Sequence, residues 1–188
     1  MAVILSARRT GIVPKGGAFA RLSLEDLAVP VVRACLMDAG IASVDEVICA
    51  NAIGPGGNPA RRTALAAALP EHVAGLTIDR QCAGGLDALL LAAALVDVGR
   101  ADFVMAGGVE SFSRRPLRFL TDPEGGAPVA YDEAPFTPWP GRNPRMAAAA
   151  AALADACGYS RAAQEAWAVA SHAKALAVAD WPEIVPLA

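Results

Sequence analysis

Short apolar runs alternate with longer segments of helical periodicity along the first part of the chain. The apolar runs at residues 2–5, 44–54, 75–79 and 101–108 have the length and composition of buried strands. Between them, apolar residues recur three and four positions apart, which is the spacing of one helix face. Strands that alternate with helices predict a mostly parallel, mixed sheet covered by helices, so we expect an α/β fold.

Capping residues mark where two of these helices begin and end. Ser23 and Asp26 have the spacing of a capping box, and Gly40 suits the C-terminal cap of the helix that follows them. Asn58 followed by Pro59 is typical of the N-cap and first residue of a helix. These signals predict helices that begin near residues 24 and 59.

The pattern changes after residue 112. Residues 113–143 are rich in proline and show no period of 2 or 3.6, which indicates a long loop or linker. Two helices are expected after it, at about residues 144–157 and 160–179. We therefore predict an α/β domain over residues 1–112 and a second, mainly helical domain over residues 113–188.

Composition and charge exclude several classes of partner. The 188 residues carry a formal net charge of −3, so there is no basic excess for binding nucleic acid. No apolar run reaches the roughly 20 residues that span a bilayer, and no basic segment precedes the N-terminal apolar run. The four cysteines are widely spaced without a Cys-x-x-Cys pair, which favours reduced thiols in a cytoplasmic protein. No metal-binding motif is expected.

Cys82 is the candidate catalytic residue, because it lies where the third predicted strand passes into an apolar helix. The first turn of a helix stabilises a negative charge by about 0.3–1 kcal/mol, which is too little to ionise a thiol fully at neutral pH without a nearby base. Gly84 and Gly85 would let a substrate approach the backbone closely, and the N–H of Cys82 would donate to an oxyanion. The alternative is a cysteine that packs the helix start. A hydrolase nucleophile elbow is disfavoured, since Arg80 occupies the position where that motif has glycine.

Several segments, in the same order, resemble the N-terminal half of the thiolases, the acetyl-CoA acetyltransferase family. They are "RRTGIVPKGG", "GPGGNPARRTALAAALP", "DRQCAGGLDAL", "MAGGVESFSRRP" and "NPRMAAAAAALADACGYS". The resemblance covers nearly the whole chain. It implies the thiolase fold, with a partial, mainly helical loop domain of the kind that covers coenzyme A.

The resemblance also implies a reaction with an acyl-CoA substrate and no separate cofactor. Cys82 would take the acyl group from a thioester, and its backbone N–H would contribute to an oxyanion hole. The second step would be a Claisen condensation or, in reverse, the thiolytic cleavage of a 3-oxoacyl-CoA. Met146 matches a methionine that lines the pantetheine channel, and Arg145 stands where biosynthetic members often carry histidine. The loop Asn58–Arg61 would lie near a dimer interface.

The second half of the family's sequence has no counterpart in these 188 residues. In the family, that half carries the Asn-Glu-Ala-Phe, Gly-His-Pro and Cys-x-Gly motifs, which supply a held water, the activating base and a second cysteine. His72 and His172 are the only histidines, and we assign them surface or packing roles. We therefore expect a large exposed apolar face, covered in a homo-oligomer or by a partner chain that supplies the C-terminal half.

Three hypotheses remain open from the sequence. The chain is one component of an acyltransferase, or a non-catalytic protein that binds acyl-CoA or regulates a full-length thiolase, or a cysteine hydrolase with His172 as its base. Glu110, in "GGVES", is either catalytic or a structural carboxylate at the end of a strand, and we favour the structural role. The remaining cysteines lie on apolar segments and are interpreted as inert; they are Cys35, Cys49 and Cys157.

Overall fold

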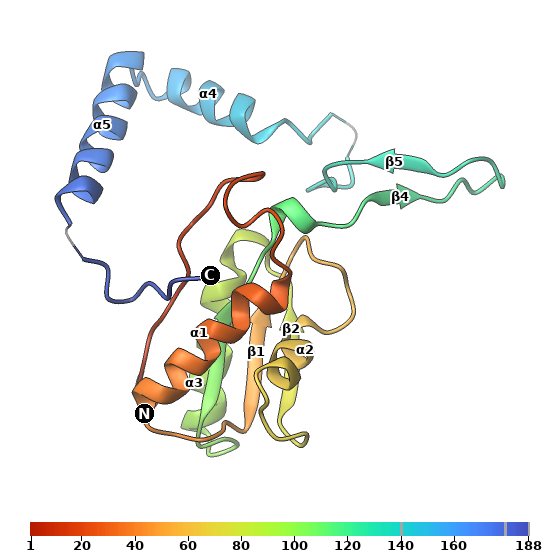
Figure 1. The fold of residues 1–188 in the computed structure, drawn as a ribbon. Coiled ribbons are helices and arrows are strands. Elements are labelled where there is room, and N and C mark those ends of the chain that lie inside the picture. The colour runs from red at the N-terminus through yellow and green to blue at the C-terminus, as the bar shows by residue number, and fades with distance from the viewer. Residues whose placement is uncertain (140, 179, 188) are drawn as a thin grey trace. The chain divides into compact units, whose positions relative to one another are not determined.

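Figure 1 shows a computed structural model of the chain, which describes residues 1–139, 141–178 and 180–187. The chain divides into two compact units. The first contains Met1–Pro116 together with the C-terminal residues from Pro182 on, and the second contains Leu117–Trp181. The sequence placed the boundary at residue 112 and assigned the C-terminal residues to the second domain. The structure differs because the final segment returns to the first unit, where Ile184 forms a parallel bridge with Arg9.

A parallel three-stranded sheet forms the centre of the first unit. Strand β1 (Glu46–Ala50) lies between β2 (Ala74–Ile78) and β3 (Val104–Gly108), and both neighbours run parallel to it. β1 and β3 lie within the runs predicted at residues 44–54 and 101–108, and β2 overlaps the run predicted at 75–79 but begins one residue earlier, which confirms the expected α/β class with a parallel sheet.

Helices cover both faces of this sheet (Figure 1). Helices α1 (Leu24–Ala39) and α2 (Pro59–Ala66) share one apolar core with Val47 and Cys49 of β1. Helix α3 (Gly84–Asp97) packs on the other face, where Ala88 and Ala92 contact Ile48. Successive residues of a strand point to opposite faces, so the three buried residues of the central strand, Val47, Ile48 and Cys49, all have to be apolar.

The predicted helix caps are present in the structure. The Ser23 side chain accepts a hydrogen bond from the Asp26 N–H, and the Asp26 carboxylate accepts one from the Ser23 N–H. Gly40 ends α1 in the left-handed conformation, with φ of 66°. The Asn58 side chain accepts from the Arg61 N–H at the start of α2.

The strand predicted at residues 2–5 was wrong. Val3, Ile4 and Leu5 belong to no strand or helix and are exposed. An apolar run forms a strand only where a neighbouring strand completes the hydrogen-bond ladder, and the described residues offer none alongside this segment. Among the residues that the structure describes, the N-terminal segment pairs through the bridge between Arg9 and Ile184.

The second unit contains a short hairpin and two helices. Strands β4 (Arg118–Leu120) and β5 (Val129–Tyr131) pair in antiparallel orientation inside the segment that we expected to be irregular. Helices α4 (Met146–Ala156) and α5 (Arg161–Ala177) confirm the two expected helices. The predicted end of the last helix, at residue 179, lies outside the described residues. None of the described helices has the length and apolar character needed to cross a membrane.

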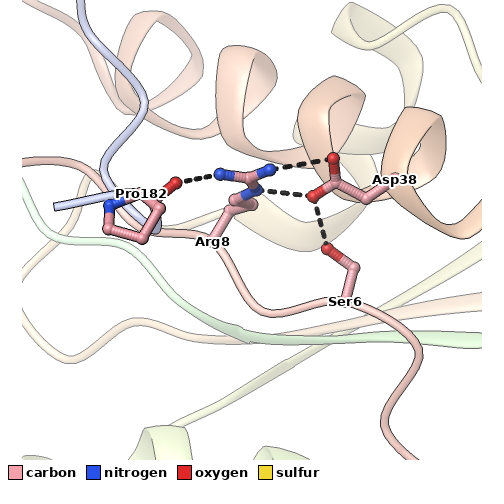
Figure 2. A network of polar contacts seen from close by, with 4 residues as sticks. All are labelled: Ser6, Arg8, Asp38 and Pro182. Carbon is pink, nitrogen blue, oxygen red and sulfur yellow. Dashed lines mark hydrogen bonds and ion pairs between the residues drawn. The ribbon is translucent and has the colours of Figure 1, made fainter. Parts of the chain in front are cut away.

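A polar cluster joins the two ends of the first unit to α1, as Figure 2 shows. The Arg8 guanidinium donates to the Asp38 carboxylate and to the carbonyl oxygen of Pro182, while the Ser6 hydroxyl donates to Asp38 at 2.9 Å. The hydrogen bond from Arg8, with that from Ser6, holds the pKa of the Asp38 carboxyl below its usual value. Arg9 adds a second link, an ion pair with Glu183 at 2.9 Å. The N-terminal and C-terminal segments are therefore tied to each other and to the helix.

Helix α3 exposes a large apolar surface. Leu86, Leu89 and Leu90 are 62%, 46% and 60% exposed, although they lie on the same helix as the buried Ala88. Leu91 and Val98 extend this exposed apolar surface along the helix. The exposed apolar face predicted from the sequence is thus confirmed, and surfaces of this kind mark places where another protein surface binds.

The contact between α2 and β2 is held by a half-buried polar network. The Asn58 amide donates to the carbonyl oxygen of Gly75 at 2.7 Å, and the Thr77 hydroxyl donates to the Asn58 carbonyl oxygen at 2.7 Å. The Ala60 N–H in turn donates to the Thr77 hydroxyl at 3.0 Å. These bonds bring the helix so close to the strand that a methyl group on Gly75 would lie 2.4 Å from the Arg61 backbone nitrogen.

We predict that Gly75→Ala destabilises the chain by about 3 kcal/mol, because the new methyl meets backbone atoms that cannot move alone. The matched control is Gly107→Ala in β3, where an added methyl meets no atom within 4 Å. The free energy of unfolding of this control should stay within about 1 kcal/mol of that of the wild type. Midpoints of chemical denaturation measure both. Equal midpoints for the two variants would contradict the close packing of α2 on β2.

Candidate active site

The carboxyl ends of the three parallel strands place the candidate residues at one edge of the sheet. Cys82 follows β2, Asn51 follows β1 and Glu110 follows β3. In open parallel sheets, this edge is where ligands bind, because the loops and helix N-termini that follow the strands gather there. The topology therefore brings Cys82 and Glu110, which are distant in sequence, to the same end of the first unit.

A tight turn carries the chain from β2 into the helix that bears Cys82. The Asp79 carboxylate accepts a hydrogen bond from the Gln81 N–H at 2.8 Å, and Gln81 adopts a left-handed backbone with φ of 51°. A single 3₁₀ turn, η1 (Gln81–Ala83), then leads into α3. Non-glycine residues rarely adopt a positive φ, and where they do they often lie at functional sites.

Cys82 is exposed at the mouth of α3. Its side chain is accessible to solvent, and it lies in the 3₁₀ turn that comes directly before α3. Unpaired N–H groups at a helix start carry positive partial charge that stabilises a thiolate or an oxyanion. The hypothesis of a cysteine packed beneath side chains is therefore wrong for this residue.

The two glycines after Cys82 differ in their surroundings. Gly84 is buried and lies over the end of β1, where an added methyl would approach the Ala50 Cβ to 2.7 Å. At Gly85 an added methyl would meet no atom within 4 Å, so the backbone there is open. The close neighbour of Gly84 is thus the chain's own strand, and the approach of a substrate to either glycine stays a prediction.

Glu110 and Asn51 brace the loop that follows β1. The Glu110 carboxylate accepts hydrogen bonds from the N–H groups of Ala52 and Ile53. The Asn51 amide donates to the carbonyl oxygen of Val109 at 2.9 Å, and its carbonyl oxygen accepts from the Gly54 N–H at 3.1 Å. Both side chains are committed to backbone groups, which supports the structural interpretation of Glu110.

A hollow of about 200 Å³ opens beside this brace, and neither Cys82 nor its neighbours line it. It lies between the loop after residue 9, the start of α1 and the residues that follow β3. The residues that line it include Thr10, Lys15, Phe19, Leu27, Glu110 and Phe112.

The other cysteines occupy different environments. Burial raises the pKa of the Cys49 thiol to about 11, so this side chain stays protonated and unreactive as predicted. Cys35 is half-buried on α1. Cys157, which we expected to be inert on an apolar segment, is exposed, because α4 buries none of its residues within the described part of the chain.

The histidines supply no base for Cys82 within the first unit. His72 is exposed in the turn that leads into β2, so it lies at the amino end of the strands, opposite the Cys82 edge. His172 belongs to α5 in the second unit, and its Nδ1 lies 2.9 Å from the carbonyl oxygen of Ala168. The described residues contain no group of three or more histidine, cysteine, aspartate or glutamate side chains that could hold a metal ion.

Arg145 and Met146 stand together at the start of α4. Arg145 is the N-cap residue and Met146 is the first residue of the helix, with its side chain 65% exposed. Both belong to the second unit. Their contact with the pantetheine arm of coenzyme A stays a prediction.

Comparison with known proteins identifies the family of this chain. The model of the thiolase N-terminal domain matches residues 2–188. The crystal structure of the Bacillus anthracis acetyl-CoA acetyltransferase superposes with a TM-score of 0.86 and 33% identity, over 98% of this chain and 50% of that one. The chain belongs to the thiolase family and has the fold of its N-terminal domain.

Two sequence relatives carry provisional names as acetyl-CoA C-acetyltransferases. YhfS of Bacillus subtilis (strain 168) is 40% identical over 171 residues, which are 91% of this chain and 43% of YhfS. VraB of Staphylococcus aureus (strain MRSA252) is 35% identical over 176 residues, covering 91% of this chain and 46% of VraB. The chain therefore spans less than half the length of these relatives.

The sequence does not reveal the residues at the end of β1 that support the candidate site. Ala50 is a strand residue, as the pattern predicts, but the pattern does not predict its contact with the start of α3, nor that Asn51 lies beyond the strand and holds the loop. One available signal was Gly54, since a glycine three residues after an asparagine is typical of a turn that the asparagine side chain closes. No signal in the sequence identifies the contact between Ala50 and Gly84.

We predict that iodoacetamide alkylates Cys82 and Cys157 in the folded chain and leaves Cys49 unmodified. Cys49 should react only when denaturant unfolds the protein, because its thiol is buried and protonated. Peptide mass spectrometry after timed labelling measures each site separately. Labelling of Cys49 at the same rate as Cys82 in buffer would contradict the structure.

Proposed function

We propose that this chain is the acyl-carrying part of a thiolase-type acyl-CoA acyltransferase, with Cys82 as the nucleophile. The observation that carries the proposal is the exposed Cys82 at the start of α3, on the carboxyl edge of the parallel sheet. Family membership and the provisional names of YhfS and VraB support the same reaction class.

The proposed first half-reaction makes use of this geometry. The Cys82 sulfur, as thiolate, attacks the carbonyl carbon of an acyl-CoA, and the charge that develops on the carbonyl oxygen is stabilised by N–H groups at the helix start. The bond between carbon and the coenzyme A sulfur then breaks. Coenzyme A leaves as a thiol with the proton that Cys82 gave up, and the acyl group remains on Cys82.

The second half-reaction forms or breaks a carbon–carbon bond. In synthesis, a second acyl-CoA loses a proton from its α-carbon, and that carbon attacks the acyl-cysteine and releases the Cys82 thiolate. In degradation, the same steps run in reverse from a 3-oxoacyl-CoA. Both directions require a base, and neither His72 nor the braced Glu110 is placed to act as one on Cys82. Neither of these side chains is therefore proposed as that base.

Arg145 and Met146 are the proposed contacts for the pantetheine arm. They begin α4, where Met146 offers an exposed, flexible apolar side chain and Arg145 a cation. The substrate proposed for the site is thus a coenzyme A thioester, with no further cofactor.

The exposed face of α3 is the proposed contact with a second polypeptide. This polypeptide is either a chain that carries the C-terminal half of a thiolase or another copy of this chain. The apolar residues Leu86 and Leu90 favour association, and the relatives are about twice as long as this chain. A partner with the C-terminal half would also supply the base.

A second candidate function is binding of acyl-CoA without turnover. It is favoured by one observation, namely that His72, the histidine of the first unit, lies before β2, at the opposite end of the strands from Cys82. The hydrolase hypothesis has no comparable support, because His172 is bonded within its own helix and the family is that of thiolases.

We predict that acetyl-CoA acetylates Cys82, slowly in this chain alone and about a hundredfold faster with a thiolase C-terminal half present, since a general base contributes that much. Peptide mass spectrometry locates the acetyl group and its rate of appearance. Cys82→Ser should abolish the thioester, whereas Cys157→Ser should leave it unchanged. Binding of acetyl-CoA with no acetylation under either condition would favour the non-catalytic alternative.

We also predict that the chain self-associates when it is alone in solution. Leu86→Glu combined with Leu90→Glu should shift it toward the monomer, because these side chains form the exposed face of α3. Met37→Glu is the matched control, since Met37 is 78% exposed on α1 of the same unit. Sedimentation velocity measures the distribution. A wild-type chain that remains monomeric at high concentration would contradict the proposed interface.

A further inference from the structure

We propose that Ala50 is a positioning residue for the nucleophile, acting through the first turn of α3. The inference rests on the proposed function of Cys82 but concerns the strand that lies beneath it. Ala50 is the last residue of the central strand, so its position is fixed by pairing with Ile78 on one side and Gly108 on the other. It is therefore a rigid point against which the helix start is placed.

The contact between Ala50 and Gly84 determines how closely the helix start lies on the sheet. A methyl group on Gly84 would lie 2.7 Å from the Ala50 Cβ, a distance that real Cβ atoms do not tolerate. Gly84 is the first of three small buried residues on the sheet-facing side of α3, followed by Ala88 and Ala92 at intervals of one turn. The side-chain size at positions 50 and 84 together thus determines the distance of this helix start from β1.

Cys82 depends on this distance because only Ala83 separates it from Gly84. The η1 turn is short, and the Gly84 N–H is bonded to the Gln81 carbonyl oxygen, so a displacement of Gly84 moves the whole turn. Gly108 of the neighbouring strand β3 is also close to Ala50. A methyl group added at Gly108 would lie 3.2 Å from the Ala50 Cβ and 3.2 Å from the Ala50 carbonyl oxygen. Ala50 is therefore packed between the start of α3 and the end of β3.

Ala50→Gly is expected to rescue Gly84→Ala and Gly108→Ala to different extents, and this difference provides the test. At Gly84 the nearest obstacle is the Ala50 Cβ, so Ala50→Gly removes the obstacle. At Gly108 a second obstacle is the Ala50 carbonyl oxygen, which Ala50→Gly leaves in place. A positioning role through the methyl group predicts rescue of Gly84→Ala by Ala50→Gly, and incomplete rescue of Gly108→Ala.

The readout is the iodoacetamide alkylation rate of Cys82 divided by that of Cys157, measured in the same full-length chain by peptide mass spectrometry. Gly84→Ala should lower this ratio about two- to fivefold, the range that a helix terminus exerts on a nearby charge. The double variant Ala50→Gly with Gly84→Ala should return the ratio to the wild-type value. Cys49 reports unfolding, because it is labelled only when the core opens.

The inference is overturned if Gly84→Ala leaves the ratio unchanged in a folded chain, or if the double variant folds without restoring it. If Gly84→Ala alone does not fold, recovery of a cooperative thermal transition and of the wild-type ratio in the double variant supports the inference, and failure to recover both overturns it. Acetylation of the wild-type chain by acetyl-CoA is measured in parallel. If acetyl-CoA does not acetylate the wild-type chain, the proposed function is wrong. The alkylation ratio then still decides whether Ala50 has a positioning role.

Discussion

The burial of β1 on both faces is the constraint on which the rest of the first unit depends. Val47 and Cys49 face α1 and α2, while Ile48 faces α3, so each helix layer is needed to keep one side of the strand from water. Because the three strands are parallel, every connection runs from a carboxyl end to an amino end through a helix. The start of α3 is thereby forced to the edge where β1 and β3 also end, and Cys82 takes its position from this topology.

The topology places the start of α3 at this edge, and small side chains then determine how close the helix lies to the sheet. A helix with Gly84, Ala88 and Ala92 on its inner side lies closer to a sheet than one with larger residues, and its first turn then rests on the final residue of β1. The loop after β1 is held by Asn51 and Glu110 at the same edge. The Cys82 thiol is exposed, but the backbone that carries it packs against the end of a central strand, and such support is what precise positioning of a side chain requires.

The sequence alone predicted those parts of the fold that depend on local patterns. Ser23, Asp26 and Gly40 marked the ends of α1 because caps satisfy backbone groups within a few residues. The strand at residues 2–5 was predicted wrongly because strand formation depends on a distant neighbour, and the hairpin of β4 and β5 was missed because its strands have three residues each. The sequence singled out Cys82 as a candidate because it stands at the boundary between a strand pattern and a helix pattern, and its catalytic role stays a prediction. The packing of Ala50 against Gly84 could not be found, since two small apolar residues more than thirty positions apart give no periodic signal.

The cluster around Arg8 has a consequence for how the chain is assembled. Because the chain leaves the first unit after Pro116 and re-enters it at Pro182, the second unit is an insertion between two parts of one folded body. Arg8 binds the re-entering segment and the end of α1 at the same time. Arg8 and Arg9 therefore hold the C-terminal segment against the first unit, so the residues on both sides of the insertion stay with the sheet that bears Cys82.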